Sequence, residues 1–364
     1  MHAILRNKIE NSDRNMITYA DYIQTALYHP EQGYYMNEQV KIGTKGDFIT
    51  SSNVSDIFGE IIGKWYSRIY RKLDLPASVC EMGAGNGRFA QAFIKGWHRC
   101  SDMPLTYSII ETSPFHRKLQ AEALDHLSNV TQYNDIDDLP QFEGLFFSNE
   151  LFDALPVHVI EKKEDKLFEV MITIEGERLA ERLAPLENQE ILKFIRVQGI
   201  HLLDGQRMEI PLEMERVIKK IGSALYRGIA VTADYGYSYE DWKHPARRNG
   251  SLRGYYQHQM IEDILKHPGR MDITSHVHFD ALIQQGESLG LRLLSILRQN
   301  EFLMKAGILE ELEEHYDLDP FSDTSRRNRA IRSLILPGGI SSAFHVIVQG
   351  KGTGSGTRVT DILG

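Results

Sequence analysis

Hydrophobic residues between positions 77 and 157 occur in short runs that alternate with stretches of helical period. This alternation is typical of a parallel sheet whose strands are joined by covering helices. The candidate strands are residues 78–82, 106–111, 129–133 and 144–148. The same rhythm resumes with a helix near 213–226 and a strand at 228–234, then a helix at 279–289 and strands at 291–297 and 343–349. The pattern predicts an α/β fold with a mostly parallel sheet of about seven strands and helices on both faces.

The chain on either side of this rhythm has other patterns. Thr18 can cap a helix that runs through Tyr28, and Ser55 can cap a second helix whose apolar residues recur at helical spacing. Alternating residues at 157–161 and 167–174 predict an inserted β-hairpin. The expected organisation is a helical cap with a glycine-punctuated loop over 1–75, a core over 76–157 and 213–350, a hairpin region over 158–212 and a flexible tail over 351–364.

Composition and charge exclude several classes of protein. The chain is 42% apolar and 25% charged, a normal globular balance, and its net charge of -9 argues against nucleic acid as the main partner. The first thirty residues carry mixed charge and lack an apolar stretch long enough for a signal peptide or a membrane span. Two cysteines cannot form a disulfide framework. We therefore expect a cytoplasmic protein without membrane contact; an amphipathic organelle transit peptide is the alternative, and the acids in this stretch argue against it. The oligomeric state stays open, with a homodimer as one alternative.

A glycine-rich turn follows the first candidate strand. The sequence EMGAGNG at 81–87 leads into the helical pattern of 88–97, and its glycines allow a tight turn and close approach of a ligand. Arg88 stands where a dinucleotide-binding turn has its third glycine, and Glu81 would repel a pyrophosphate. S-adenosylmethionine has no phosphate and carries positive charge on its ammonium and sulfonium groups. We therefore expect this cofactor rather than NAD, held at Glu81, Gly83, Gly85 and Gly87.

Polar residues also follow the second and third candidate strands. Glu111 ends the second strand, where a carboxylate can accept both ribose hydroxyls. Thr112 comes next, and Ser113 can cap the following helix. Asn134 or Asp135 could meet the adenine amino group, although Asp135, Asp137 and Asp138 also suit a plain turn. Glu111, Thr112, Ser113 and Asp135 are thus candidate cofactor-binding residues.

The fourth candidate strand delivers Asn149, Glu150 and Asp153 to the same edge of the sheet. Methyl transfer from a sulfonium is an in-line displacement, so the protein must align the nucleophile and remove its proton. Glu150 and Asp153 could hold a cationic or hydroxyl nucleophile, or they could cap the following helix. From the residues alone, Asp234 and Tyr235 after the fifth strand could be only a turn.

Several motifs together resemble one known family. From Thr18 to about Val348 the chain is similar to the MidA and NDUFAF7-like (DUF185) group of class I methyltransferases, whose mitochondrial members methylate protein arginine. The matching motifs are GDFITSS (46–52), FGEIIGKW (58–65), EMGAGNG (81–87), SNELFDALPVH (148–158), ADYGY (233–237), GSLRGYYQH (250–258) and PGRMDITSHVHF (268–279). The resemblance implies a Rossmann-like class I methyltransferase fold with S-adenosylmethionine as cofactor.

The resemblance also implies roles for particular residues. It implies that a loop bearing Gly46, Asp47, Thr50 and Ser51 folds over the cofactor. It further implies that Asp234 and Tyr235 line the substrate side with Glu150 and Asp153, and that the substrate is a side-chain nitrogen of a protein, arginine first. The chain departs from the family pattern at Ser51–Val54 and at His278, differences that concern the substrate rather than the cofactor.

Other functions remain as alternatives. A small-molecule O- or N-methyltransferase would share this fold. An assembly factor could also bind the cofactor and act by binding a partner protein. An NAD-dependent oxidoreductase is disfavoured by Glu81 and Arg88. His276 and His278 have the spacing of a metal pair on a strand, but they lack a clear third ligand. We therefore expect core or cleft histidines and no metal.

Overall fold

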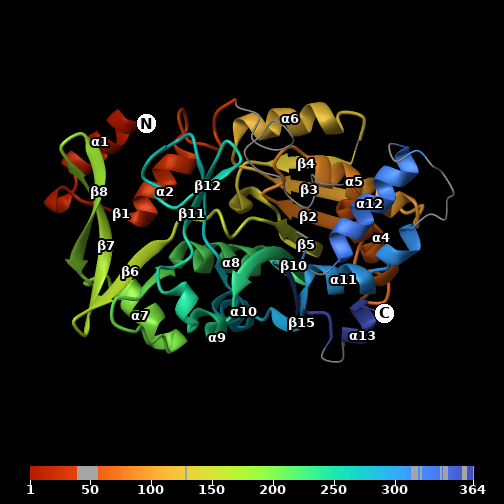
Figure 1. Ribbon diagram of the computed structural model, residues 1–364. Helices are drawn as coiled ribbons and strands as arrows, with labels where there is room; N and C mark the ends of the chain where they lie inside the picture. The colour runs from red at the N-terminus through yellow and green to blue at the C-terminus, as the bar shows by residue number, and fades with distance from the viewer. Residues whose placement is uncertain are drawn as a thin grey trace.

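The alternating middle of the chain forms one large sheet in the computed structural model, which describes residues 1–38, 56–127, 129–312, 319, 322–336, 338, 343–354 and 359–363 (Figure 1). The strand order is β15-β16-β10-β5-β2-β3-β4, and a short strand, β14 (Val277–His278), also pairs with β10. The strand bounds are β2 (Ser78–Met82), β3 (Thr106–Ile110), β4 (Val130–Tyr133), β5 (Phe142–Asn149), β10 (Leu225–Tyr237), β15 (Arg292–Arg298) and β16 (Phe344–Lys351).

Strand directions confirm the predicted α/β class. The strands from β4 to β10 are mutually parallel, whereas β16 is antiparallel to both of its neighbours. The large sheet has eight strands rather than about seven, because β14 adds to β10 beyond the main order. Helices α4 (Ile57–Ile69) and α5 (Arg88–His98) cover one face, and α8 (Leu212–Ala224) and α10 (Phe279–Ser288) cover the other.

Strand β5 shows why a sheet covered on both faces has nearly continuous apolar strands. Phe147 points to one face and stacks on Phe89 of α5, with ring centroids 4.4 Å apart. The next residue back, Phe146, points to the other face and belongs to the core formed with Ile218 and Leu282. Because neighbouring side chains of a strand point to opposite faces, both must be apolar here.

The predicted hairpin exists but belongs to a separate sheet. Strands β6 (His158–Lys163) and β7 (Lys166–Glu175) pair antiparallel, as expected, and lie in a five-stranded sheet of order β1-β7-β6-β9, with β8 on β7. A third, three-stranded sheet has the order β12-β11-β13. The remaining bounds are β1 (Ile17–Thr18), β8 (Arg178–Pro185), β9 (Arg207–Ile210), β11 (Arg253–Tyr256), β12 (Gln259–Ile261) and β13 (Asp272–Thr274).

The N-terminal region is not a single cap. Helices α1 (His2–Glu10) and α2 (Tyr19–Tyr28) share a core with the five-stranded sheet, whereas α4 packs against α5 in the core of the large sheet. The predicted cap of α2 is confirmed, since the Thr18 side chain accepts from the Asp21 backbone N–H. The second helix is present from Ile57, with Asp56 before it; Ser55 lies outside the described residues.

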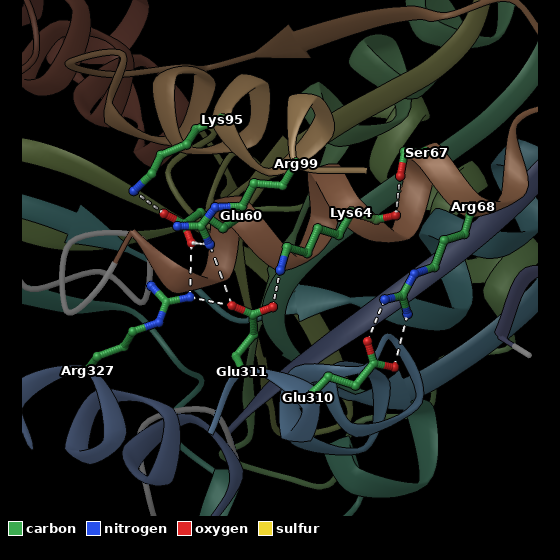
Figure 2. A network of polar contacts seen from close by, with 9 residues as sticks. All are labelled: Glu60, Lys64, Ser67, Arg68, Lys95, Arg99, Glu310, Glu311 and Arg327. Atoms are coloured by element: carbon green, nitrogen blue, oxygen red, sulfur yellow. Dashed lines mark hydrogen bonds and ion pairs between the residues drawn. The ribbon is translucent and has the colours of Figure 1, made fainter. Parts of the chain in front are cut away.

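The described part of the C-terminal segment includes a helix, where the sequence predicted a flexible tail. In this helix, α13 (Val359–Leu363), Ile362 and Leu363 are buried, and the Trp65 indole N–H donates to the Ile362 carbonyl. Ion pairs centred on Glu60 and Glu311 join α4 and α5 to the C-terminal elements (Figure 2). The other bounds are α6 (Pro114–Leu124), α7 (Gln189–Gln198), α9 (Tyr239–Trp242), α11 (Gln299–Lys305), α12 (Asp323–Ile335), η1 (Asp13–Asn15), η2 (Ile136–Asp138), η3 (Pro245–Arg247) and η4 (Ile308–Glu311). In the described part of the chain, no helix combines the length and apolarity needed to cross a bilayer.

Candidate active site

The chain reverses its direction of travel across the large sheet between β2 and β5. From β2 it steps outward to β3 and β4, then returns past β2 to form β5 and β10 on the other side. In open α/β sheets, ligands bind at such a switch point, beyond the carboxyl ends of the strands. The glycine turn after β2 and the polar residues after β3 and β5 therefore meet where a ligand site is expected.

The glycine turn needs glycine for its backbone. Gly83, Gly85 and Gly87 have φ values of 77°, 54° and 79°, in the left-handed region that side chains disfavour. The Gln120 amide of α6 donates to the Gly85 carbonyl at 2.7 Å, and a Cβ on Gly87 would lie 3.2 Å from Gln120 Cγ. The turn is thus held tightly against α6, with its inner surface free of side chains from these three positions.

Glu111, the predicted ribose-binding residue, lies across from this turn. Its carboxylate accepts from the Gly85 N–H at 3.1 Å through one oxygen and from the Ser113 N–H at 2.9 Å through the other. Burial raises the pKa of Glu111 to about 7, although these backbone hydrogen bonds act in the opposite direction. A carboxylate fixed beside a bare glycine turn suits a diol such as ribose, so the residues present fit an adenosyl cofactor.

The neighbours of Glu111 have structural tasks. The Ser113 hydroxyl accepts from the His116 N–H as the cap of α6 and donates to the Tyr35 carbonyl at 2.7 Å. Thr112 is exposed, and its carbonyl accepts from Arg117. These contacts account for Ser113 as a cap and leave its contact with a cofactor a prediction.

Asp135 lies at the start of η2. Its side chain caps this short helix by accepting from the Asp137 N–H at 3.0 Å, and it also pairs with Lys220 at 3.2 Å. The plain turn that the sequence allowed is therefore present, and contact with the adenine amino group stays a prediction.

The sequence argument for Glu81 was wrong about its surroundings. Glu81 is 3% exposed, and its carboxylate accepts from the Tyr107 hydroxyl at 2.7 Å. Burial raises the pKa of Glu81 to about 8, so the side chain is largely protonated at neutral pH. A buried, neutral carboxyl cannot repel a pyrophosphate in the way that the charge argument required.

The turn after β5 carries buried acceptor atoms. Asn149 Oδ1, Glu150 Oε2 and Asp153 Oδ1 are all buried and have no hydrogen-bond partner within the described residues. Glu150 has a φ of 50°, an uncommon conformation for a glutamate and one found at functional sites. No helix begins here in the described structure, because residues 150–156 turn directly into β6. Helix capping by Glu150 and Asp153 is therefore excluded.

Asp234 and Tyr235 complete this side of the site from within β10, which continues to Tyr237; the interpretation of these residues as a turn is wrong. The two Asp234 oxygens accept from the Phe152 N–H at 3.0 Å and from the Tyr235 N–H at 2.9 Å. The Tyr235 hydroxyl donates to Asp153. Asp234 therefore holds the turn in place, and Tyr235 fixes one of the two candidate substrate carboxylates.

Three residues that were not predicted also belong to the site. The Tyr35 hydroxyl donates to Asp272 Oδ1 at 2.6 Å, and the Tyr28 hydroxyl donates to the Ala154 carbonyl at 3.0 Å. Asp272 is buried on β13 of the three-stranded sheet, whereas Asp153 lies in the turn between β5 and β6. The only signal for it in the sequence was its place inside the motif at 268–279.

The charges around this cluster are mainly negative. Burial raises the pKa of Asp153 to about 7, and it raises those of Glu150 and Asp234 well above their ordinary range. The neighbouring charges that raise these pKa values are other carboxylates, including Asp272. Bringing a cation into the cluster would stabilise the ionised carboxylates, so the site is suited to a positively charged ligand.

The two histidines are packed on separate aromatic rings. His276 stacks on Tyr237 at 4.2 Å, and His278 stacks on Trp242 at 4.5 Å. Burial lowers the pKa of His276 to about 4 and that of His278 to about 3, so both are neutral. Across the described residues, no group of three or more potential metal ligands occurs. Gly46, Asp47, Thr50 and Ser51 lie outside the described residues.

Comparisons with known proteins agree with this geometry. Residues 61–297 match the family described as "Putative S-adenosyl-L-methionine-dependent methyltransferase". The protein arginine methyltransferase NDUFAF7 homolog of Drosophila melanogaster is 30% identical over 75% of this chain and 67% of that protein. The Rattus norvegicus protein arginine methyltransferase NDUFAF7 is 27% identical over 90% of this chain and 80% of its own length.

A solved structure is similar over almost the entire chain. A COG1565 superfamily member from Burkholderia thailandensis, bound to S-adenosylhomocysteine, has a TM-score of 0.89 and 27% identity over 99% of this chain and 93% of that one. Its ligand is the product that S-adenosylmethionine leaves after methyl transfer. Taken with the glycine turn, Glu111 and the family match, these similarities show that the chain belongs to the MidA and NDUFAF7-like (DUF185) family of S-adenosylmethionine-dependent methyltransferases.

Proposed function

We propose that this enzyme methylates the side chain of an arginine in a protein. The supporting observation is the set of three buried acceptor atoms on Asn149, Glu150 and Asp153 that have no hydrogen-bond partner among the residues that the structure describes. A guanidinium group is planar, has five N–H donors and no acceptor, and pairs with carboxylates through two parallel hydrogen bonds. The relatives named as protein arginine methyltransferases support the same substrate class.

In this proposal the two halves of the site have separate tasks. Gly83, Gly85 and Gly87 leave room for the cofactor, and Glu111 binds its ribose. S-adenosylmethionine, when bound, supplies a methyl group activated by the positive sulfur. The covering role of Gly46, Asp47, Thr50 and Ser51 stays a prediction, as does any contact of Thr112, Ser113, Asp135 or Asn149 with the cofactor.

On the acceptor side, Glu150 and Asp153 hold the guanidinium and aim one nitrogen at the methyl group. Tyr235 restricts Asp153 by donating to it, and Asp234 fixes the turn on which both acids lie. The reacting nitrogen must lose a proton, and in this proposal Asp153, whose pKa is raised to about 7, accepts it. Alignment and proton removal together are the two contributions that this reaction requires.

Substitution of the two acids tests the proposal. Glu150→Gln and Asp153→Asn should each reduce methyl transfer by at least about a hundredfold, the usual contribution of a positioned acid or base. Both variants should still bind S-adenosylhomocysteine, because Glu111 and the glycine turn are unchanged. Glu177→Gln, an exposed residue in the turn between β7 and β8, is the matched control and should keep full activity.

The assay uses methyl-labelled donor with lysate from a strain that lacks this protein, followed by hydrolysis and identification of the labelled species. Methylarginine in the protein fraction is the expected result. Label in small metabolites alone would replace the proposal with a small-molecule methyltransferase. If Glu150→Gln still restored the function lost in that strain but formed no methylated product, the result would instead indicate an assembly factor.

The cellular location is a separate matter. The cytoplasmic location expected from the sequence remains a prediction. The names of the two relatives include the word mitochondrial, which applies to those proteins alone. Fractionation of cells that express a tagged copy would check it. Chromatography with light scattering would decide whether the protein is a homodimer.

A further inference from the structure

The segment that follows α2 is held firmly against that helix. The Tyr34 N–H donates to the Ala26 carbonyl, and the Tyr35 N–H donates to the Leu27 carbonyl, both at 2.9 Å. The Tyr35 ring lies 5.6 Å from that of Tyr28 and 5.2 Å from that of Tyr34. Tyr35 therefore has little freedom to move independently of α2. Its carbonyl and its phenol are held in one arrangement, so order gained at one of these groups is shared by the other.

Tyr35 makes one hydrogen bond to each half of the active site. Its carbonyl accepts from the Ser113 hydroxyl at 2.7 Å, next to the candidate ribose-binding residue Glu111. Its phenol donates to Asp272 at 2.6 Å, in the carboxylate cluster on the acceptor side. Burial raises the pKa of Tyr35 well above its ordinary range, so the phenol keeps its proton at neutral pH.

Ser113 is placed to respond to the cofactor. Its backbone N–H donates to the Glu111 oxygen that does not bind Gly85. A carboxylate has about four lone-pair sites, so ribose hydroxyls that donate to Glu111 can occupy the sites that these backbone groups leave free. Cofactor binding would thereby fix the Glu111–Ser113 contact, and the Ser113 hydroxyl would extend that order to Tyr35.

We propose that Tyr35 is a positioning residue that couples cofactor binding to the order of the acceptor side. Cofactor binding at Glu111 strengthens the Ser113–Tyr35–Asp272 chain and thereby fixes the carboxylate cluster for the acceptor. By thermodynamic linkage, the acceptor then favours cofactor binding by the same factor. The proposal depends on Glu111 as the ribose contact, and not on arginine as the acceptor.

Hydrogen exchange with S-adenosylhomocysteine as the probe tests this coupling. In the wild type, the ligand should slow amide exchange in peptides that cover residues 81–87 and 111–117, and also in those that cover 270–275. Tyr35→Phe removes only the phenol bond to Asp272. The variant should keep the ligand-induced protection at 81–87 and 111–117. Its ligand-induced protection at 270–275 should be about fivefold smaller than in the wild type, the change expected for one hydrogen bond.

Tyr22→Phe is the matched control. Tyr22 lies on α2, the helix against which Tyr35 is held, and its buried phenol donates to the Ile264 carbonyl, away from the carboxylate cluster. This variant should lose stability comparable to that of Tyr35→Phe, yet keep the ligand-induced protection at 270–275. If Tyr35 had a purely structural role, both variants would show the same ligand-induced protection at 270–275. That result would overturn the proposal.

Ser113→Ala interrupts the chain at its other end. It should reduce the ligand-induced protection at 270–275 by the same factor as Tyr35→Phe, and the double variant should lose no more than either single variant, because the two bonds act in series. Absence of ligand-induced protection at 270–275 in the wild type would refute the coupling outright. No acceptor is present in these experiments, so a failure of the arginine assignment would leave their outcome unaffected.

Discussion

At the scale of single residues, Glu81 shows how burial in the fold determines whether a carboxyl group is charged. Burial raises the pKa of Glu81 to about 8 from an ordinary value of 4.5. The folded chain therefore holds this proton more tightly than the unfolded chain does. The resulting stability is fully present below pH 4.5 and is lost as the pH rises through about 8.

Glu81→Gln should remove this pH dependence. The amide oxygen can still accept from Tyr107, and no charge has to be buried at high pH. We expect similar stabilities for variant and wild type near pH 4, and a more stable variant at pH 8. The gain should be at least about 1 kcal/mol, since a tenfold change in proton affinity is worth about 1.4 kcal/mol. Urea unfolding at both pH values measures it, and a variant that is less stable at pH 8 would contradict the assignment.

At the scale of elements, α4 and α5 cross at glycines. A Cβ on Gly96 would lie 2.1 Å from the Glu60 carbonyl oxygen, and one on Gly63 would lie 2.1 Å from the Phe93 carbonyl oxygen. Each glycine thus meets the backbone of the other helix, which cannot move aside as a side chain can. This crossing fixes α5, whose first residue follows the glycine turn of the cofactor site.

Gly96→Ala should therefore destabilise the protein. A clash with backbone should bring the cost of overpacking to the upper part of the range of about 1 to 3 kcal/mol, above the gain of about 1 kcal/mol that alanine brings to a helix interior. Gly222→Ala in α8 is the control, because its new methyl would meet the Leu289 side chain, which can adjust. Denaturant unfolding should show a clearly larger loss for Gly96→Ala. Equal effects would mean that the helices can separate at little cost.

At the scale of the whole molecule, the ion pairs of Figure 2 join distant parts of the chain. Glu60 of α4 is 1% exposed and pairs with Lys95 at 2.6 Å, Arg99 at 2.8 Å and Arg327 of α12 at 3.1 Å. Burial alone would raise the pKa of Glu60, but these cations lower it below its ordinary value. The stability that it contributes is present above pH 4.5 and is lost as the pH falls through the lowered pKa.

Glu60→Gln should cost about 1 to 3 kcal/mol at pH 7, since it removes a buried charge from three cations. The difference from wild type should shrink as the pH falls below 4.5, the opposite direction from Glu81. Glu310→Gln, which breaks the exposed pair with Arg68, should cost less than about 1 kcal/mol. Thermal unfolding over this pH range provides the comparison, and equal losses for the two variants would contradict a buried network.

The sequence alone determined the features that depend on short stretches of chain. Apolar periodicity predicted the strands of the large sheet, because a strand covered on both faces must be apolar wherever it lies. The glycines at 83, 85 and 87 predicted the cofactor turn, because only glycine adopts those angles easily. Glu111 followed from its place at the end of the next parallel strand.

Only the tertiary structure decided which side chains meet across separate elements. Periodicity does not say which face of β2 lies under α5, so it could not show that Glu81 would be buried on Tyr107. It also could not bring Tyr35 and Asp272 together, because a contact between residues so far apart in sequence is set by how the three sheets pack. The burial of α13 likewise depends on a surface that other elements, including α4, provide. The composition of the C-terminal segment alone cannot predict that surface.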